Sequence, residues 1–223
     1  VEEAITYKDY TNIILELYNK QTEKDKAYFL ERGISPEIID KYKLCIGDTK
    51  KLHDKYYDKR AIIPIWENGK VVNFNARSLD KNPKIKYLKG PGTFPPLNIG
   101  YLETAKKGET IIVTEGEFDA LSLESIGIKA IAIGGVANYK NFTENNPRAD
   151  LLVLTAFDND DKGQNVKSKH KINIPKKYKD INDWIQGNKE EFKESIYKQI
   201  EGQKRPDSLY NYMLNRLMPD IEQ

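Results

Sequence analysis

Two apolar stretches that each end in carboxylates limit most strongly what this chain can fold into. Residues 111–119 read IIVTEGEFD and residues 151–160 read LLVLTAFDND. Unbroken runs of Ile, Val and Leu predict strands buried on both faces, as in a parallel sheet covered by helices. Because such sheets bind ligands at the carboxyl ends of their strands, we expect Glu115, Asp158 and Asp160 to converge there. Neighbouring carboxylates repel one another, so the pattern favours a divalent metal site.

The second half of the chain alternates between strand and helix patterns. A helix should follow the first acidic motif and end at Gly127. The alternation predicts a small α/β domain with a parallel sheet. A helical tail with a break at 202–206 should follow. The expected strands are 110–114, 129–133 and 151–157, and the expected helices are 118–126, 190–200 and 208–217.

The first half predicts a smaller α+β unit. Ser35 followed by Pro36 is a strong helix start, because Ser caps free amides and Pro lacks an amide that would need a partner. Asn68 and Gly69 stand between two β-rich runs and predict a hairpin turn. The expected helices are 7–19, 25–31 and 36–42, and the expected strands are 61–66 and 71–77.

The connection after Asp158 is short for a parallel crossover. If residues 172–174 form the next parallel strand, only residues 164–171 remain after the acidic loop. Such a crossover normally needs about a dozen residues or more, usually with a helix. We therefore expect that residues are missing from the sequence between about Gln164 and His170. The alternative is that the strand pairs antiparallel or that the helix is absent.

Charge is distributed unevenly along the chain. The net charge is +2 over 223 residues, but residues 41–107 hold 15 Lys and Arg against 6 Asp and Glu, a net of +9. This region is a candidate surface for a phosphate backbone. A solvated lysine-rich face is the alternative.

The composition excludes several classes of protein. Cys45 is the only cysteine, so an internal disulfide and a cysteine-rich zinc site are both impossible. The two histidines, His53 and His170, are interpreted as ordinary residues rather than ligands. No apolar stretch approaches the roughly 20 residues that span a bilayer, which predicts a soluble intracellular protein without a membrane partner.

Three acidic motifs together resemble the TOPRIM domain, which is shared by primases, topoisomerases and certain nucleases. They are Glu115-Gly116, Asp158-x-Asp160-x-x-Gly163 and Lys179-Asp180-Ile181-Asn182-Asp183. The first half in turn resembles the amino-terminal subdomain of bacterial DnaG-type primases and of their phage and mobile-element relatives. The matching stretches are 28–35, 60–65, 69–77 and 86–88, within a resemblance that spans about residues 25–186.

The resemblance implies three regions and one activity. The regions are a basic amino-terminal subdomain at 1–105, a TOPRIM metal-binding domain at 106–187 and a helical tail at 188–223. The implied enzyme is a DNA primase, a nucleotidyltransferase that makes short RNA primers from nucleoside triphosphates on single-stranded DNA with Mg²⁺ or Mn²⁺. The implied partner is a replicative helicase, or a helicase domain outside this chain, in the cytoplasm of a bacterial host.

The resemblance also assigns roles to four acids. Asp158 and Asp160 are the expected metal ligands, and Asp180 is a further ligand or a supporting acid. Glu115 is either another ligand or the base that helps to deprotonate the attacking hydroxyl. For Glu115 and Asp158 the alternative is a structural acid that interacts with a helix dipole.

Basic residues of the first half are expected to contact the nucleotide or the DNA. Arg can bind a phosphate through two parallel hydrogen bonds, although a structural salt bridge is the alternative for Arg77. A glycine pair after the middle strand would let a ligand approach the backbone, or would simply form a tight turn. The expected contacts are Arg77 and Lys86, then Arg60, Tyr87 and Lys89, and the glycine pair is Gly134 and Gly135.

The chain also departs from the family. One cysteine cannot build the usual amino-terminal zinc module, and the GxxxxGK[ST] loop of a helicase motor is absent from the sequence. Residues 94–98 read FPPLN, where primases usually carry another basic residue. Two other functions stay open: a TOPRIM-type nuclease that activates water, and a non-catalytic module that binds DNA or recruits the replisome.

Overall fold

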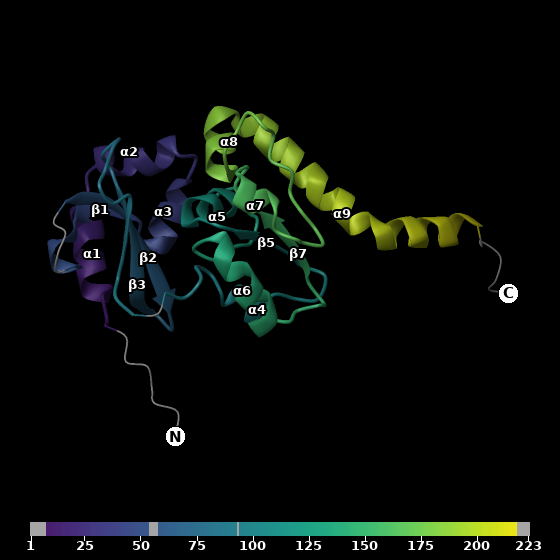
Figure 1. The fold of residues 1–223 in the computed structure, drawn as a ribbon, viewed down its shortest axis with the longest axis horizontal. Helices are drawn as coiled ribbons and strands as arrows, with labels where there is room; N and C mark the ends of the chain where they lie inside the picture. The colour runs from purple at the N-terminus through teal and green to yellow at the C-terminus, as the bar shows by residue number, and fades with distance from the viewer. Residues whose placement is uncertain (1–7, 54–57, 93, 218–223) are drawn as a thin grey trace, which may run out of the picture.

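Two sheets lie next to each other in the computed structural model, which describes residues 8–53, 58–92 and 94–217 (Figure 1). Within these residues the first half forms a four-stranded antiparallel sheet, and the second half forms a three-stranded parallel sheet. The predicted α/β fold, with a separate α+β unit before the parallel sheet, is therefore confirmed.

The antiparallel sheet has the strand order β1-β2-β3-β4. The predicted hairpin turn at Asn68 and Gly69 is confirmed, since both residues have positive φ angles of 49° and 75° and they join two paired strands. The strands are β1 (Cys45–Asp48), β2 (Lys59–Glu67), β3 (Lys70–Ser78) and β4 (Tyr87–Lys89).

Helices cover both faces of this sheet. Tyr10 and Ile14, at the start of α1, pack with Phe74 on one face, and α2 and α3 cover the other face. Ser35 caps α3 through its side chain, with Pro36 in the first turn, as predicted. The helix expected from Tyr7 begins at Thr11, and Tyr7 itself lies outside the described residues. The elements are α1 (Thr11–Lys20), α2 (Glu23–Glu31), α3 (Pro36–Tyr42) and the 3₁₀ turn η1 (Thr49–Lys51).

The parallel sheet has the order β6-β5-β7, so the first strand of this half lies in the middle. Both outer strands run parallel to it, which places the carboxyl ends of all three at one edge. The strands are β5 (Thr110–Thr114), β6 (Ala130–Ala132) and β7 (Leu152–Ala156). The helical elements are α4 (Tyr101–Thr104), α5 (Glu117–Glu124), η2 (Val136–Asn138), α6 (Tyr139–Asn145) and α8 (Ile181–Gly187).

The connection after β7 contains a single helical turn, α7 (Asp161–Gln164). The chain then returns to β7 through one parallel bridge between Thr155 and Lys171. The expectation of missing residues between about Gln164 and His170 is wrong, since the sequence is complete across this stretch. An antiparallel pairing is also wrong, and a full crossover helix is replaced by one turn and an extended stretch. The reason is composition, because residues 165–171 lack the apolar stripe with which a helix would pack on the sheet.

The tail is one helix, α9 (Lys189–Leu217), and not the two helices that the sequence predicts. Its first part packs on the core through Phe192, Ile196 and Ile200, and the rest extends away from both sheets (Figure 1). Gly202 and the proline at 206 disfavour a helix by about 1 and 3 kcal/mol, respectively, relative to alanine. Strong helix formers on both sides, mainly Glu and Lys before Gly202 and Leu, Met and Arg after the proline, oppose this cost. The predicted break at 202–206 is wrong.

One hydrophobic core joins the two halves. Phe29 of α2, Phe118 of α5 and Trp184 of α8 belong to the same buried cluster. Polar contacts reinforce the junction, such as the Ser35 amide, which donates to Ser125 Oγ at 2.9 Å. Among the described residues, none of the helices is apolar over a length that would cross a membrane.

Candidate active site

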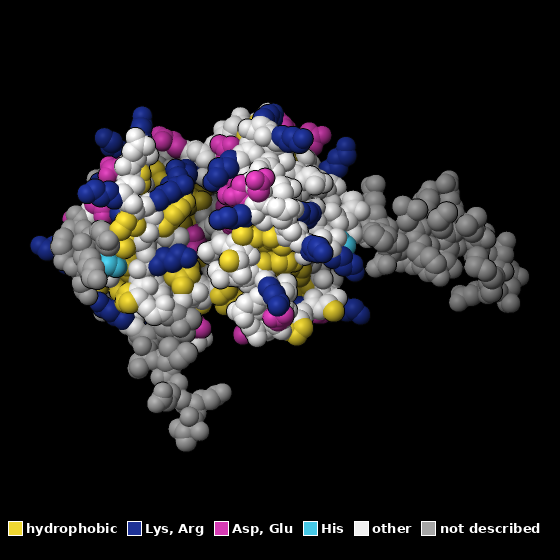
Figure 2. All heavy atoms as spheres, viewed as in Figure 1, with side chains coloured by type: hydrophobic (Ala, Val, Ile, Leu, Met, Phe, Trp, Pro, Cys, Tyr) yellow, Lys and Arg dark blue, Asp and Glu magenta, His cyan; other side chains and the backbone are white. Residues whose placement is uncertain are grey.

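A pocket of about 520 Å³ opens where the antiparallel sheet faces the carboxyl edge of the parallel sheet. Figure 2 shows a group of acidic side chains on this side of the molecule with basic side chains around it. The antiparallel half contributes Arg32, Asn75, Arg77, Lys86, Tyr87 and Lys89. The other half contributes Glu115, Gly116, Glu117, Phe118, Asp119, Gly134, Gly135, Asp158, Lys179, Asp180, Asn182, Asp183 and Gln186.

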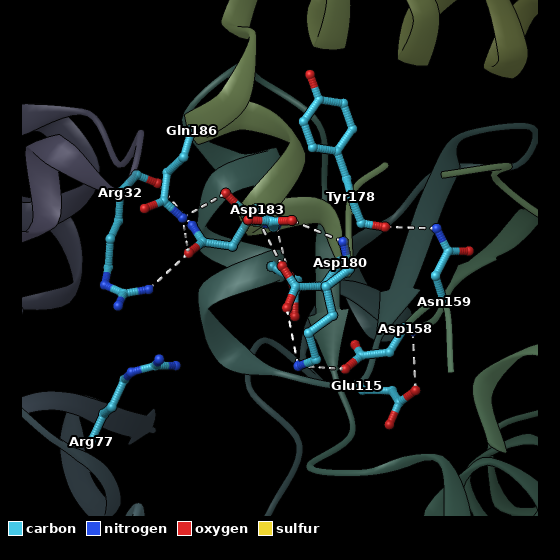
Figure 3. A network of polar contacts seen from close by, with 12 residues as sticks. Arg32, Arg77, Glu115, Asp158, Asn159, Tyr178, Asp180, Asp183 and Gln186 are labelled. Atoms are coloured by element: carbon cyan, nitrogen blue, oxygen red, sulfur yellow. Dashed lines mark hydrogen bonds and ion pairs between the residues drawn. The ribbon is translucent and has the colours of Figure 1, made fainter. Parts of the chain in front are cut away.

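Three of the four predicted acids meet in this pocket. Glu115 follows β5, Asp158 follows β7, and Asp180 caps α8. Glu115 Oε1 accepts a hydrogen bond from the Asp158 amide at 3.1 Å (Figure 3). Parallel strands produce this meeting, because their carboxyl ends lie at one edge of the sheet.

The acids of the pocket disfavour one another's charge. Burial, followed by the charge of Asp158, raises the pKa of Glu115 above its ordinary value. Burial also raises the pKa of Asp158, against the opposing effect of Lys179, and the charges of Asp180 and Asp160 add to the rise. The pocket therefore concentrates negative charge that a cation would stabilise.

Gly163 allows the acidic loop to fold tightly. A Cβ atom at this position would lie 2.3 Å from the Asp158 carbonyl oxygen and 3.0 Å from Glu115 Oε1. The backbone oxygen cannot move without disturbing the loop, so a larger residue would displace the two acids. The glycine of the second motif thus has a steric role in the site.

Asp160 lies beside the pocket with a different set of contacts. It is exposed, and its Oδ1 accepts a hydrogen bond from the Gly163 amide at 2.8 Å as the N-cap of α7. Its charge still contributes to the raised pKa of Glu115 and of Asp158. The structure thus gives Asp160 a capping contact, and its predicted role as a metal ligand stays a prediction.

Lys179 lies between two of the acids. Its Nζ is 3.2 Å from Asp158 Oδ2 and 3.5 Å from Asp180 Oδ2. Although burial alone would lower the pKa of Lys179, Asp158 and Asp180 raise it to about 12. Its presence in the third motif was visible in the sequence, but its contact with Asp158 was not.

Asn159 fixes the acidic loop from behind. Its Nδ2 donates to the carbonyl oxygens of Ile174, Pro175 and Tyr178 at 3.1, 3.2 and 2.8 Å. Its Oδ1 accepts from Gln164 Nε2 at 2.9 Å. The residue between the two acids of the motif therefore joins the loop to the segment before α8, a role that the sequence analysis missed.

A buried polar layer supports the pocket. Asp119 Oδ1 accepts a hydrogen bond from the Asn182 amide at 2.9 Å. Burial, followed by the charge of Asp180, raises the pKa of Asp119 well above its ordinary value. Asn182 also donates from Nδ2 to the Arg32 carbonyl and to Ser122 Oγ, each at 2.8 Å. These contacts join α2, α5 and α8 below the acids.

A second buried pair lies on the opposite side of the pocket. Asn75 Nδ2 donates to Glu117 Oε2 at 2.6 Å, across the junction of the two sheets. Burial raises the pKa of Glu117. The sequence places each of these two residues inside a motif but does not indicate that they pair, because the contact joins positions far apart in the chain.

Basic side chains form the other side of the pocket. Arg77 donates to Tyr87 Oη at 2.6 Å and lies 5.6 Å from the centroid of the Phe118 ring, while Arg32 lies 4.9 Å from the same ring. Among the described residues Arg77 has no carboxylate within ion-pair distance, so the structural salt bridge is not seen (Figure 3). Burial and the charges of Arg77 and Lys179 lower the pKa of Lys86.

Arg60 does not line this pocket. Only 3% of it is exposed, its Nε pairs with Asp58 at 2.7 Å, and its Nη1 donates to the Ala76 carbonyl at 3.2 Å. The expectation that Arg60 contacts the nucleotide or DNA conflicts with this placement, because its guanidinium already binds within the antiparallel sheet. The sequence could not show that the neighbouring strand would bury it.

The glycine pair lies at the edge of the same pocket. Gly134 and Gly135 have φ angles of 71° and 132°, so both need the freedom of glycine. A Cβ at Gly134 would lie 3.1 Å from Lys89 Nζ. Approach of a ligand to this turn stays a prediction that its position supports.

The donor set of the pocket fits a hard divalent cation. Mg²⁺ and Mn²⁺ prefer carboxylate oxygens, and Mg²⁺ keeps several waters, so few protein ligands suffice. Glu115, Asp158 and Asp180 supply such oxygens, and because burial and the neighbouring acids raise the pKa of Glu115 and of Asp158, a cation nearby would favour their ionised forms. Within residues 8–53, 58–92 and 94–217, however, no three acids, histidines or cysteines already converge as a closed ligand set.

Part of the second half is similar to a known protein family. Residues 112–193 match the family described as Toprim-like. This range contains the end of β5, all of β7 and α8, and the three acidic motifs. The resemblance of these motifs to the TOPRIM domain is therefore confirmed.

Two curated relatives are DNA primases. The primase of Clostridium acetobutylicum is 29% identical over 178 residues, which cover 63% of this chain and 30% of the relative. The primase of Legionella pneumophila is 31% identical over 137 residues, which cover 57% of this chain and 24% of the relative. The chain thus spans less than a third of the length of these relatives.

A solved structure described as the DnaG catalytic core shares the fold. Its TM-score is 0.62 at 19% identity, and the match covers 93% of this chain and 82% of that chain. The match includes both sheets, so the likeness extends to the antiparallel half that the Toprim-like family does not cover. The predicted fold of a DnaG-type core is confirmed.

Proposed function

We propose that this chain, a homologue of DNA primases that carries a Toprim-like domain, is a primase catalytic core that joins ribonucleotides into short primers on single-stranded DNA. One observation carries the proposal beyond homology. The acids Glu115, Asp158 and Asp180 line the same pocket as Arg77 and Lys86. Acids suit divalent ions and basic groups suit a triphosphate, and primer extension needs both at one place.

The acids are proposed to hold the divalent metal, Mg²⁺ or Mn²⁺. When bound, such an ion neutralises the charge that develops on the phosphate as the ribose 3′-hydroxyl attacks. Asp158 and Asp180 would ligate it. Glu115 would be a further ligand or would accept the proton of the hydroxyl, for which its raised pKa is suited. Asp160 would add charge, or a ligand, from the rim.

The basic side is proposed to orient the nucleotide and the template. Arg77 is fixed by Tyr87 Oη and by the ring of Phe118, so its guanidinium can face a phosphate without losing much side-chain entropy. Lys86 and Lys89 would add charge, and Tyr87 would present an aromatic edge for base contact. We infer from its burial that Arg60 supports this surface from below.

The proposed domain division follows from this arrangement. Residues 1–105 would supply the basic side, residues 106–187 the acids, and residues 188–223 the tail. Residues 97–105 need a finer assignment, because Leu97 bridges Ala132 of β6, and Leu102 packs with the parallel sheet. A helicase that works with this core remains the expected partner.

Primer synthesis provides the test. The protein is incubated with single-stranded DNA, labelled nucleoside triphosphates and Mn²⁺, and new oligonucleotides are separated by electrophoresis. We expect synthesis by the wild type and none by Asp158→Asn, which keeps the size of the side chain but removes its charge. Asp161→Asn is the matched control, because Asp161 is exposed and does not line the pocket.

The same reaction separates the alternatives. A nuclease would shorten the template in the wild type but not in Asp158→Asn, and a binding module would retain the DNA without making or cutting any strand. Absence of new oligonucleotides over a range of templates would overturn the primase proposal. Of the three functions, the comparisons favour the primase, since the curated relatives above carry that name.

A further inference from the structure

Lys179 holds a position that a bound metal would need. Its ammonium lies within 3.5 Å of one oxygen each of Asp158 and Asp180. These acids are the two that the proposed function assigns most directly to the metal. A divalent ion held by these two carboxylates would therefore have to displace the ammonium.

The backbone of Lys179 cannot follow such a displacement. Its amide donates to Asp183 Oδ2 at 2.9 Å, and its carbonyl accepts from the Asn159 amide at 2.7 Å. The side chain, by contrast, is largely exposed to solvent, with 61% of its surface accessible, so it has room to rotate. The ammonium of Lys179 can therefore move only by rotation about the side-chain bonds, while the backbone stays in place.

Charge alone explains why Lys179 occupies this position. Asp158 is half-buried beside Asp180 and Asp160, so its ionised form needs a positive neighbour. Lys179 supplies one positive charge and a divalent ion supplies two, so the ion is the stronger partner once it is present. The lysine stabilises the site until then.

The neighbouring groups indicate where the displaced ammonium would go. Lys179 is close enough to Lys86 that its charge lowers the pKa of Lys86, and both side chains line the pocket together with Arg77. The Lys179 ammonium would be the third cation beside Arg77 and Lys86. This position would be unfavourable in the absence of a ligand and favourable beside a triphosphate, which carries several negative oxygens. Movement of Lys179 would thus join the metal side to the nucleotide side.

We propose that Lys179 is a tethered counter-ion that competes with the divalent metal for Asp158 and Asp180 and turns to the triphosphate when the metal binds. The inference rests on the proposed function, because it uses the metal and nucleotide positions assigned there. Its consequence is reciprocal coupling, in which metal and nucleotide each increase the affinity of the other. Lys179 then acts as a positioning residue for both ligands.

Metal binding without template or synthesis is the first test. Mn²⁺ affinity is measured by electron paramagnetic resonance for the wild type, Lys179→Gln, Lys179→Arg and Lys177→Gln. Lys177 is the matched control, since it pairs at 3.0 Å with Glu191 and lies outside the pocket. We expect Lys179→Gln to bind Mn²⁺ about tenfold more tightly, within the usual range of coupling energies. Lys179→Arg and Lys177→Gln should stay near the wild type.

A non-reactive triphosphate analogue provides the second readout. It should increase Mn²⁺ affinity strongly in the wild type and in Lys179→Arg, and much less in Lys179→Gln. Equal or weaker Mn²⁺ binding by Lys179→Gln than by the wild type would overturn the competition. An unchanged enhancement by the analogue would overturn the movement to the triphosphate.

Nuclear magnetic resonance keeps the inference testable if Lys179→Gln does not fold. The side-chain ammonium of Lys179 is identified in ¹⁵N-labelled wild type by its loss in Lys179→Arg. Titration with Mg²⁺ should shift this signal and leave that of Lys177 in place. A signal that does not respond to Mg²⁺ would contradict displacement. Primer synthesis is measured apart from all these readouts, so its absence would overturn the proposed function alone.

Discussion

The Asn159 amide donates to the Lys179 carbonyl oxygen at 2.7 Å and joins the acidic loop after β7 to the segment that precedes α8. This contact ties the backbone next to Asp158 to the backbone next to Asp180. The Asn159 side chain adds three more contacts to the same segment. The spacing of the two acids therefore depends on a residue that carries no charge.

Replacement of Asn159 by Ala should destabilise the fold and weaken the site. The carbonyl oxygens of Ile174 and Tyr178 would lose this donor, whereas that of Pro175 keeps the Tyr178 amide, and each unsatisfied buried group costs about 1–3 kcal/mol. We expect a clearly lower midpoint of thermal unfolding and a lower Mn²⁺ affinity. Asn165→Ala is the control, because Asn165 is exposed at the end of α7. An Asn159→Ala protein as stable as the control would refute the bracing role.

Two substitutions of Asp160 should separate capping from charge. Asp160→Asn keeps an N-cap for α7 and removes the charge, whereas Asp160→Ala removes both, and loss of a cap costs about 1 kcal/mol. If Asp160 serves the metal, both variants should lose primer synthesis, although only Asp160→Ala is destabilised. The measurements are chemical denaturation and the primer assay. Full synthesis by Asp160→Asn would limit Asp160 to its capping role.

Arg77→Ala and Asp158→Asn should differ in their effect on DNA affinity. Loss of one phosphate contact reduces the slope of log affinity against log salt by about 1, so Arg77→Ala should bind single-stranded DNA more weakly and with a smaller salt dependence. Asp158→Asn removes a negative charge and should bind at least as tightly as the wild type. Fluorescence anisotropy at several salt concentrations checks both. Equal losses in the two variants would contradict this division between metal and phosphate contacts.

Cys45 should be unreactive in the folded protein. It is fully buried in β1, and burial raises the pKa of its thiol from 9.0 to about 12. Because the unfolded thiol ionises first, this residue's contribution to stability is complete below about pH 9 and is lost as the pH rises towards 12. A thiol reagent at pH 8 should modify Cys45 at the rate of unfolding. Rapid modification of the native protein would show that β1 opens without global unfolding.

The position of the acids was predictable because it follows from strand direction alone. An apolar run followed by an acid, repeated once, indicates parallel strands, and parallel strands bring Glu115 and Asp158 to one edge. The hairpin at Asn68 and Gly69 was predictable for a similar reason, since the turn chemistry is local. Both features follow from patterns within short stretches of the chain, which can be recognised in the sequence.

Contacts between distant segments were not predictable from one sequence. The burial of Arg60 depends on the strand that pairs with β2, and the contact between Lys179 and Asp158 depends on the return of the chain after α7. The continuous α9 was missed because single Gly and Pro residues weaken a helix without deciding its end. These outcomes depend on tertiary packing or on sums over many residues.

The short connection after β7 has a consequence for solubility. Without a full crossover helix, β7 is an outer strand, covered on its free side by one bridge from Lys171. Exposed strand edges invite pairing with another molecule, and lysines beside an edge oppose it. Residues 162–179 contain Lys at seven positions and neither Asp nor Glu. We therefore expect the segment that replaces the helix to oppose edge-to-edge pairing of two copies by mutual repulsion, and we expect high salt, which screens that repulsion, to favour such pairing.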